Sequence, residues 1–403
     1  MSEVEYEPVS VKEILAEMKD TAELLIDLSY SAVLLGSDDI AEEVLDLEER
    51  MDVLHLKARM SLLMAARNPE DAEALAPVLG VVGAAEKISD AAGDIAKIVL
   101  EEIGLPDAMR ATLPEAVETL VRAELAPDAP YVDHTLGEAH LETETGVRVI
   151  AIHRAGEWLL NPGPETGLRA GDVLLLRGPE TGIGAVYEVV TGSAYEFPDP
   201  PDPAIDDLER AVDSTVHMKD MSELAVDLAY GAALFDSPEV AEEVLELEAE
   251  VDALQSRFEA WTLQAAGRVE DPITLRGLVR LGQATEVISD AAVEISEGVL
   301  RGIGTHPVVA EAVKESDEII VRVTVGPDSP LDGTTLGEER VATETGMRVI
   351  AVRRAGAGER GDQPREQWVV SPDRETGLRA GDVLIAKGTD AGADRLAALA
   401  GGR

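Results

Sequence analysis

The chain has 403 residues, and its 80 acidic residues against 34 basic ones give a formal net charge of −46 at pH 7. This charge repels nucleic acid phosphates and anionic lipid headgroups, so neither is expected as a partner. The absence of cysteine excludes disulfides, thiolate catalysis and cysteine-ligated zinc. No run approaches the roughly 20 apolar residues that span a bilayer, and no secretion signal is visible at the start. We therefore expect a cytoplasmic protein that reaches a membrane only through a partner.

The acidic residues are spread along the whole chain and alternate with apolar residues, so they do not form a disordered acidic tail. Lysine is much scarcer than arginine. This combination is typical of proteins from salt-accumulating organisms, in which salt screens the repulsion between surface carboxylates. The charge therefore indicates a halophilic source and says little about mechanism.

An internal duplication determines the organisation of the chain. The string MKDTAELLIDLSY from Met18 recurs 200 residues later as MKDMSELAVDLAY from Met218. The string ETGLRAGDVLLLRG from Glu165 recurs 210 residues later as ETGLRAGDVLIAKG from Glu375. The second copy therefore contains a ten-residue insertion between Gly356 and Trp368, which we expect to lengthen a hairpin loop.

The first part of each copy has helical periodicity. Apolar residues between Ile14 and Ala32 recur on one helix face, and Gly36 is expected to end that helix. A second helix is predicted to start near Ser37 and to end at Asn68–Pro69. A third apolar stripe continues to the region of Gly104. Three long helices with short connections predict an antiparallel bundle.

The second part of each copy changes to β-rich runs separated by glycine and proline, over about 113–190. A short helix is expected between the first two strands. Strict alternation along the strand VRVIAIHR places Val149 and Ala151 on one face and Ile150 and Ile152 on the other. A proline-rich, acidic segment at 193–207 is predicted to link the two copies as a semi-rigid spacer.

The string LGEAHLETETGVRVIAIHRAGEWLLNPGPETGLRAGDVLLLRG resembles the TrkA C-terminal domain, also called RCK-C. That domain is the ligand-sensing half of cytosolic regulators of potassium channels and transporters. The helical part resembles the PhoU domain through ELLID and EKISD. Complete regulators of this type carry a Rossmann domain before RCK-C, but this chain has no G-x-G-x-x-G motif between a strand and a helix. The partial match GIGAVYEVV at Gly182 lacks the third glycine, so NAD or ATP binding of the Rossmann kind is not expected.

The predicted fold class is α+β and multidomain, with two repeats that each place a PhoU-like three-helix bundle before a small α+β RCK-C module. The predicted bundles occupy 1–112 and 208–312, the RCK-C modules 113–192 and 313–403, and the linker 193–207.

The resemblance to PhoU implies metal sites, because PhoU proteins bind metal clusters through acidic E/D-x-x-x-D motifs. An i, i+4 spacing places both carboxylates on one helix face, where two oxygens reach one hard cation such as Mg²⁺. The alternative, favoured here, is an ordinary solvated acidic face, since such pairs arise by chance in a chain with this many acidic residues. The candidate residues are Glu23, Asp27, Glu86, Asp90, Glu223, Asp227, Glu286 and Asp290.

Arginines gather in the β-rich modules against the acidic background, and guanidinium groups suit phosphate oxygens. RCK-C domains of some potassium regulators bind cyclic di-AMP at a two-fold interface, so the resemblance implies a ligand site between paired modules. In the alternative, the strand faces the core and its arginines pair with acidic neighbours. The candidate ligand-binding residues are Ile150, His153, Arg154, Pro162, Ile350, Arg353, Arg354 and Pro372.

No Ser-His-Asp set, P-loop or convincing acid–base pair is present, and the histidines show no metal-ligand spacing shared by both copies, so an enzyme is not expected. The leading hypothesis is a cytosolic, homodimeric regulatory subunit. It would control cation transport, with potassium as the expected ion, through a membrane channel or transporter. Its ligand would be cyclic di-AMP or another small ion. The alternatives are a PhoU-like metal-binding adaptor in phosphate signalling, with RCK-C modules for dimerisation, and a scaffold that binds neither ligand.

Overall fold

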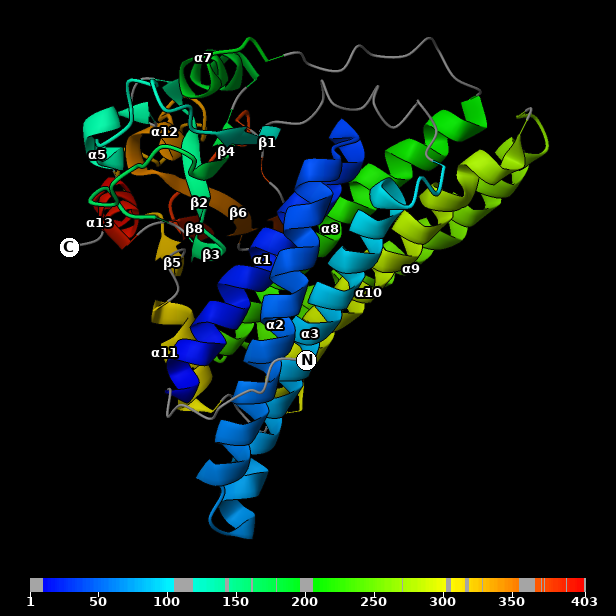
Figure 1. The fold of residues 1–403 in the computed structure, drawn as a ribbon. Coiled ribbons are helices and arrows are strands. Elements are labelled where there is room, and N and C mark those ends of the chain that lie inside the picture. Colours follow the sequence, from blue (N-terminus) through cyan, green and yellow to red (C-terminus); the bar gives the residue numbers. More distant parts are fainter. Residues whose placement is uncertain are drawn as a thin grey trace.

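The fold is seen in a computed structural model of the chain (Figure 1). The residues that the structure describes are 10–104, 119–141, 145–160, 162–178, 180–195, 206–269, 271–301, 306–315, 319–327, 329–354, 367–370, 372, 374–388 and 390–401. The predicted hairpin insertion and most of the predicted linker lie outside these residues.

Each repeat contributes three long helices to one elongated bundle, in the part of the chain that the structure describes. The helices of the first repeat are α1 (Val11–Leu35), α2 (Asp38–Ala65) and α3 (Pro69–Leu100). Those of the second are α8 (Asp206–Phe235), α9 (Pro238–Ala266) and α10 (Arg276–Leu300), with the short helix η2 (Pro272–Leu275) before α10. Helices α3 and α10 pack against each other and join the two repeats.

Local sequence signals set the ends of the helices. Gly36 adopts the left-handed conformation with φ at 60° and donates its N–H to the last turn of α1. The side chain of Ser37 caps α2 by accepting a hydrogen bond from the N–H of Ile40 at 3.3 Å. Asn68 caps α3 in the same way, with Pro69 as its first residue. These tight connections make consecutive helices antiparallel, so the predicted three-helix bundles are confirmed.

Each repeat also contains a four-stranded antiparallel sheet. The first sheet contains β1 (Thr119–Glu124), β2 (Arg148–Arg154), β3 (Glu157–Leu160) and β4 (Val173–Gly178), in the order β1-β4-β2-β3. The second contains β5 (Ile319–Thr324), β6 (Met347–Arg354), β7 (Gln367–Val370) and β8 (Val383–Gly388), in the order β5-β8-β6-β7. The two sheets therefore share one topology.

Short helices accompany the two sheets. In the first repeat they are α5 (Leu136–Ala139) and α7 (Glu180–Thr191). In the second repeat they are α11 (Pro307–Glu315), α12 (Val341–Thr345) and α13 (Asp390–Leu399). Helix α11 packs against α1 of the other repeat, so it adds a contact between the two copies.

A β-bulge in β2 changes which side chains meet the bundle. The pairing of β2 with β4 shifts between Val149 and Ala151. As a result Ile150 and Ala151 both join the core shared with the helices, whereas Val149 and Ile152 join the core beneath α7. The predicted strict alternation along this strand is therefore wrong, because the extra residue at the bulge turns two consecutive side chains the same way.

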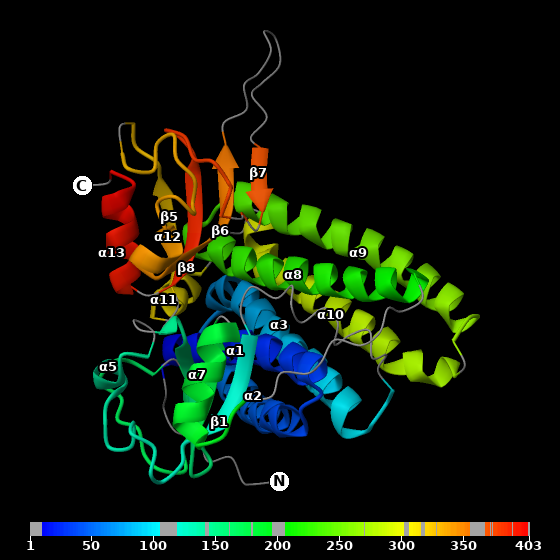
Figure 2. The same cartoon turned by 90° about the horizontal axis from the view of Figure 1, so that it is seen from above.

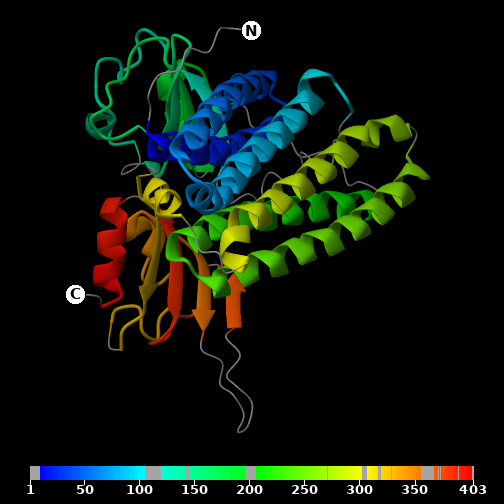
Figure 3. The same cartoon turned by 90° about the horizontal axis from the view of Figure 1, so that it is seen from below.

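Figures 2 and 3 show the two sheet modules on either side of the same end of the bundle, each beside the helices of its own repeat. Each sheet lies between the bundle and its own terminal helix, α7 or α13. None of the helices within the described residues combines the length and apolarity needed to cross a membrane. The observed architecture is α+β with two repeats, as predicted.

Candidate functional site

A network of ion pairs lies where α1, α8 and the two sheets meet. Glu23 on α1 contacts Lys19 at 2.7 Å and Lys387 of β8 at 3.1 Å. Asp27, one turn further along α1, accepts a hydrogen bond from Nη1 of Arg177 on β4 at 2.9 Å. Lys387 belongs to the second repeat, so it links that repeat's sheet to the first repeat's helix.

The second copy repeats this pattern and also includes an arginine of β6. Lys219 contacts Glu223 on α8 at 2.7 Å, and Lys387 contacts Asp227 at 2.7 Å. Arg348 of β6 adds contacts to Glu223 at 3.3 Å and to Asp227 at 3.2 Å. Through Lys387 and Arg348, the second sheet therefore holds α8 at both carboxylates.

Burial and charge act in opposite directions on these carboxylates. Burial raises the pKa of Glu23 and of Asp27 above their usual values, and the neighbouring cations lower it only in part. At Glu223 burial also opposes ionisation, but the charges of Lys219, Arg348 and Arg177 hold its pKa well below the usual range. Charge pairing therefore decides the ionisation of Glu223, whereas burial outweighs it at Glu23 and Asp27.

All four candidate metal-binding residues in α1 and α8 take part in these ion pairs. Asp227 is only 2% exposed, so a solvated acidic face, the favoured interpretation of this pair, is wrong. The carboxylates of Glu23, Asp27, Glu223 and Asp227 are opposed by Lys19, Lys219, Lys387, Arg177 and Arg348. Because these cations already balance the carboxylates, the arrangement argues against a metal ion here.

The other candidate metal pairs lie on α3 and α10. Asp90 and Asp290 are exposed, and Glu86 and Glu286 are half-buried. Burial and then the charge of Glu86 raise the pKa of Asp90. Glu86 also contacts Nδ1 of His55 at 2.8 Å. Neighbouring lysines lower the pKa of Asp90 and of Asp290 only in part. A cation site at these pairs stays a prediction.

The predicted ligand-binding residues do not form one surface within the chain. Six of them lie on β2 and β6, and the two prolines follow β3 and β7. The two sheets flank the bundle end (Figures 2 and 3). Ile150 and Ile350 are buried in the core shared with the helices. Pro162 and Pro372 are half-buried. Arg353 is half-buried too. The pKa of Glu239 is lowered mainly by a backbone hydrogen bond and by a hydrogen bond with Ser237, and the charge of Arg353 lowers it further.

Arg154 and Arg354 each pair with a buried aspartate of their own module. Arg154 donates from Nε and Nη2 to Asp172 at 2.7 and 2.6 Å, and from Nη2 to the carbonyl of Gly167 at 2.7 Å. Arg354 contacts Asp382 at 3.2 Å and the carbonyl of Gly377 at 2.6 Å. These bonds explain the repeated string ETGLRAGDVL as a structural element, and they support the alternative in which arginines pair with acidic neighbours.

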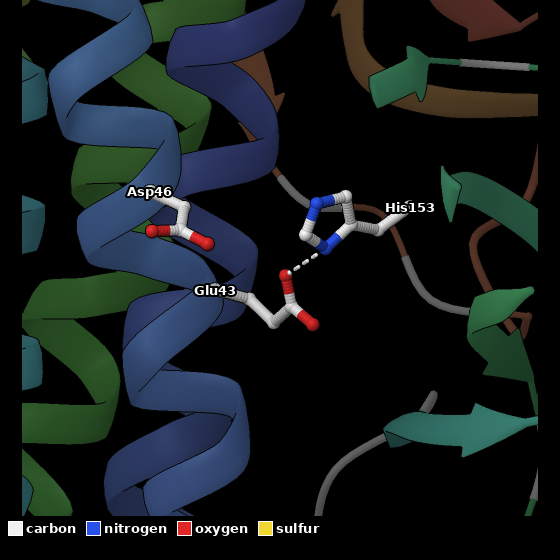
Figure 4. A group of neighbouring side chains, drawn as sticks. All are labelled: Glu43, Asp46 and His153. Atoms are coloured by element: carbon white, nitrogen blue, oxygen red, sulfur yellow. Dashed lines mark ion pairs between the residues drawn. The ribbon is translucent and has the colours of Figure 1, made fainter. Parts of the chain in front are cut away.

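His153 meets helix α2 in a group that its sequence spacing does not reveal. Its Nδ1 lies 2.7 Å from Oε2 of Glu43, and Asp46 lies one turn further along the same helix (Figure 4). The His153 ring is stacked on Trp158, with ring centroids 4.7 Å apart. Contacts between residues so far apart in sequence cannot be found from spacing alone.

A cavity of about 380 Å³ opens on the second sheet module. Three of its lining residues are arginines, namely Arg340, Arg348 and Arg374. The other lining residues come from α12, the start of β6 and the segments around Gly337 and Pro372. Of the eight predicted ligand-binding residues, Pro372 is the one that lines this cavity. Three guanidinium groups around one cavity suit an anionic ligand.

Two of the three cavity arginines have no arginine at the aligned position of the first copy. Arg340 and Arg374 align with His140 and Pro164 of the first copy, whereas Arg348 aligns with Arg148. Arg340 pairs with Glu344 at 3.4 Å. Within the described residues, the exposed guanidinium of Arg374 has no hydrogen-bond or ion-pair partner. A position-by-position comparison of the two copies is the sequence signal that could have revealed this asymmetry.

Two family models match the chain, each of them twice. The PhoU domain model matches residues 15–99 and 215–299, and the TrkA-C domain model matches residues 120–191 and 320–401. The chain is a tandem PhoU and TrkA-C domain protein. The six long helices are its PhoU domains, and the two sheet modules are its TrkA-C domains.

Solved structures of both kinds resemble the chain at low identity. PhoU from Pseudomonas aeruginosa is 14% identical, with 72% of this chain and 96% of that chain covered and a TM-score of 0.41. The GsuK RCK domain is 17% identical, with 72% and 64% covered and a TM-score of 0.19. The human SLO3 gating ring is 11% identical, with 83% and 79% covered and a TM-score of 0.25. No curated protein compared with the chain matches it. The assignment of PhoU and TrkA-C domains therefore depends on the family models.

Proposed function

We propose that this tandem PhoU and TrkA-C protein is a regulatory subunit that senses a small anion and controls cation transport through a membrane partner. Both of its domain families are regulatory and non-catalytic. RCK domains and gating rings of channels are among the structures with some likeness to the chain. A regulator is therefore a better hypothesis than an enzyme.

The position of Arg348 carries this proposal. Its side chain lines the cavity of the second TrkA-C domain and also contacts Glu223 and Asp227 of α8. The side chain is 48% exposed, so an incoming ligand has access to it. One arginine thus connects a candidate anion site to a helix of the second PhoU domain.

An anion in the cavity would compete with two carboxylates for the same guanidinium. A ligand shifts a conformational equilibrium only if it binds one arrangement better than the other. A phosphate bound to Arg348 weakens the ion pairs that hold α8 against the sheet, so it favours an arrangement in which the two domains separate. This difference in affinity would couple ligand binding to the position of the PhoU helices.

The finer parts of the proposal concern the ligand, the partner and the assembly. Cyclic di-AMP is the proposed ligand, because its two phosphates suit guanidinium groups. A potassium channel or transporter subunit is the proposed membrane partner, and a homodimer would pair TrkA-C domains of two chains. In this proposal the protein is cytoplasmic and reaches the membrane through that partner.

Calorimetry on the full chain at high salt tests the proposal. Cyclic di-AMP should bind, and Arg374→Ala and Arg340→His should each weaken binding about tenfold, since each removes a charge-assisted hydrogen bond. Arg301→Ala is the matched control, because Arg301 is an exposed arginine at the end of α10, where it pairs with Glu297. Absence of binding, or equal affinity in all variants, would contradict the proposal. A pull-down from native membranes tests the partner separately.

The alternative of a metal-binding adaptor is supported by a different observation. Burial and neighbouring carboxylates raise the pKa of Asp90 and of Asp290 at the two PhoU motifs. Mutual repulsion of this kind is relieved by a bound cation. Titration with Mg²⁺ or Mn²⁺ tests this function. It is favoured if the ion binds, if the double substitution Glu86→Gln and Asp90→Asn abolishes that binding, and if cyclic di-AMP does not bind.

A further inference from the structure

A histidine and two carboxylates meet where the first TrkA-C domain rests on helix α2. Glu43 and Asp46 are three residues apart on α2, and His153 is on β2 (Figure 4). One potential ligand atom from each residue lies within 4.8 Å of the other two. Among the described residues, no other set of three acidic or histidine side chains comes this close. The first copy therefore brings together groups that fit a metal ion.

The contact between His153 and Glu43 is a close ion-pair contact that lacks the geometry of a good hydrogen bond. Nδ1 and Oε2 are 2.7 Å apart, yet Oε2 is a buried oxygen with no hydrogen-bond partner within the described residues. The Glu43 side chain is only 7% exposed, so solvent does not satisfy this oxygen well. Two ligands of one tetrahedral ion are separated by about 3.4 Å when their bonds to the metal are near 2.1 Å. The buried oxygen and the ring nitrogen would therefore need to move apart by less than about 1 Å to become neighbouring ligands.

The surroundings hold both groups in position. The stacking of His153 on Trp158, at an interplanar angle of 4°, fixes the plane of the ring. Arg122 donates from Nε to Oε1 of Glu43 at 3.2 Å, which leaves Oε2 as the oxygen directed at His153. Such support of a ligating carboxylate by a hydrogen bond is usual around metal ions. His153 and Glu43 are therefore each held by a contact of their own, and Asp46 on the same helix completes the group.

The charges near this group suit a divalent ion. Glu43 and Asp46 are negative, and Asp39 lies 3.9 Å from Arg122. Arg122 cancels one of these three carboxylate charges, and two remain when His153 is neutral. One divalent cation would balance them. A ring nitrogen among the ligands favours zinc, cobalt or nickel over magnesium, which prefers oxygen alone.

We propose that Glu43, Asp46 and His153 bind one divalent transition-metal ion that fastens the first TrkA-C domain to helix α2 of the first PhoU domain. The ion would bridge two domains of one repeat. The proposal is independent of anion sensing in the second TrkA-C domain and of the E/D-x-x-x-D pairs, because it uses none of their residues.

The second copy supplies a built-in comparison. Glu243 and Glu246 keep carboxylates at the two helix positions, but Arg353 replaces His153. A guanidinium remains protonated and does not ligate metals. The proposal therefore predicts one ion for each chain, bound in the first repeat.

Cobalt titration of the full chain provides the test, after treatment with a chelator and in a high-salt buffer with millimolar Mg²⁺ to occupy weak acidic sites. One equivalent of Co²⁺ should bind and give the visible absorption bands of a nitrogen-ligated ion, and Zn²⁺ should displace it. His153→Arg, which installs the residue of the second copy, should weaken binding at least about tenfold. Circular dichroism melting checks that this variant is folded.

Two controls make the result decisive. Glu246→Gln changes the equivalent helix position of the second repeat and should leave the stoichiometry and the spectrum unchanged. The double substitution Glu86→Gln and Asp90→Asn should also leave them unchanged. The proposal is overturned if Co²⁺ does not bind, if His153→Arg binds it as well as the original chain does, or if the Glu86 and Asp90 substitutions abolish the spectrum.

Discussion

Arg348 donates a hydrogen bond from Nη2 to Oδ2 of Asp227 at 3.2 Å, although 121 residues separate them in the sequence. The other oxygen of Asp227 accepts a hydrogen bond from Lys387 at 2.7 Å. One buried carboxylate on α8 therefore holds two strands of the second TrkA-C domain. This contact is one of the attachments of that domain to the bundle, beside the hydrophobic core that the two share.

Asp227→Asn is expected to lower the free energy of unfolding by about 3 kcal/mol, because it removes the buried carboxylate charge that Arg348 and Lys387 share and leaves them their contacts to Glu223 and Glu23. Urea unfolding followed by circular dichroism at fixed salt measures this loss. Asp220→Asn is the matched control, since the Asp220 side chain on the same helix is 55% exposed and contacts only Lys219 in the ion pairs of this helix. Its effect should stay below about 1 kcal/mol. Equal losses in both variants would refute the special role of Asp227.

Arg154→Ala and Arg354→Ala are expected to destabilise their modules. Each substitution leaves a buried aspartate at the start of a strand without its arginine partner. Asp172 is 1% and Asp382 is 3% exposed, and breaking such a pair costs about 3 kcal/mol. Thermal unfolding measures the change, with the exposed Arg379→Ala as control. If both substitutions weaken cyclic di-AMP binding without any loss of stability, these arginines have the ligand-binding role predicted from the sequence and not a structural one.

The sequence was enough to predict the elements of each repeat but not the contacts between them. Helical periodicity correctly separated the apolar face of α1 from Glu23 and Asp27. A helical wheel, however, shows one helix alone, so the polar face opposite the apolar stripe was interpreted as solvated. In the structure the second repeat supplies Lys387 to Glu23, and β4 supplies Arg177 to Asp27. Long-range pairing of the two repeats buries that face.

The site residues show the same limit of local patterns. Pro372 was predicted to line a ligand site and lies in the cavity, but Ile350 was turned into the core by a bulge equivalent to that in β2. Arg340 and Arg374 were not singled out as cavity residues, because the loops that carry them meet only in the folded module. There the N–H of Gly337 donates a hydrogen bond to the carbonyl of Arg374 at 2.8 Å. Bulges and loop contacts of this kind have no periodic signature in the sequence.

A compensating pair in the two bundles predicts a rescue by double substitution. Phe258 on α9 packs against Gly282 on α10, where an added Cβ would lie 2.6 Å from the ring. The first copy has the small Ala58 and the larger Val82 at the aligned positions. Gly282→Val and Phe258→Ala should each destabilise the chain by about 2–4 kcal/mol, through overpacking and through a cavity respectively.

The double variant restores the residue pair of the first copy and should recover at least about 1 kcal/mol relative to the sum of the single losses. A double-mutant cycle from urea unfolding curves measures this coupling. Gly83→Ala serves as a control for the backbone effect of glycine in a helix. Nothing lies within 4 Å of its added Cβ, so it should stabilise the chain by about 1 kcal/mol. Strictly additive losses in the cycle would show that the two positions do not share one packing site.

Glu243 predicts a dependence of stability on pH. Burial, and then the charges of Glu246 and Glu250, raise the pKa of Glu243 from 4.5 to about 7. The folded chain therefore holds a proton that the unfolded chain has already released, and the free energy of unfolding falls as the pH rises between these two values. Above about pH 7 both states are ionised and the full penalty of the buried charge remains.

Glu243→Gln should remove this penalty, so it should raise the free energy of unfolding by about 1 kcal/mol at about pH 8, after allowance for screening by solvent. The gain should vanish at about pH 4, where the carboxyl is neutral in both states. Urea unfolding of the two proteins across this pH range, at constant salt, measures the difference. Glu242→Gln, at the exposed neighbouring position, should give a curve parallel to that of the original chain. A parallel curve for Glu243→Gln as well would mean that Glu243 ionises normally in the folded protein.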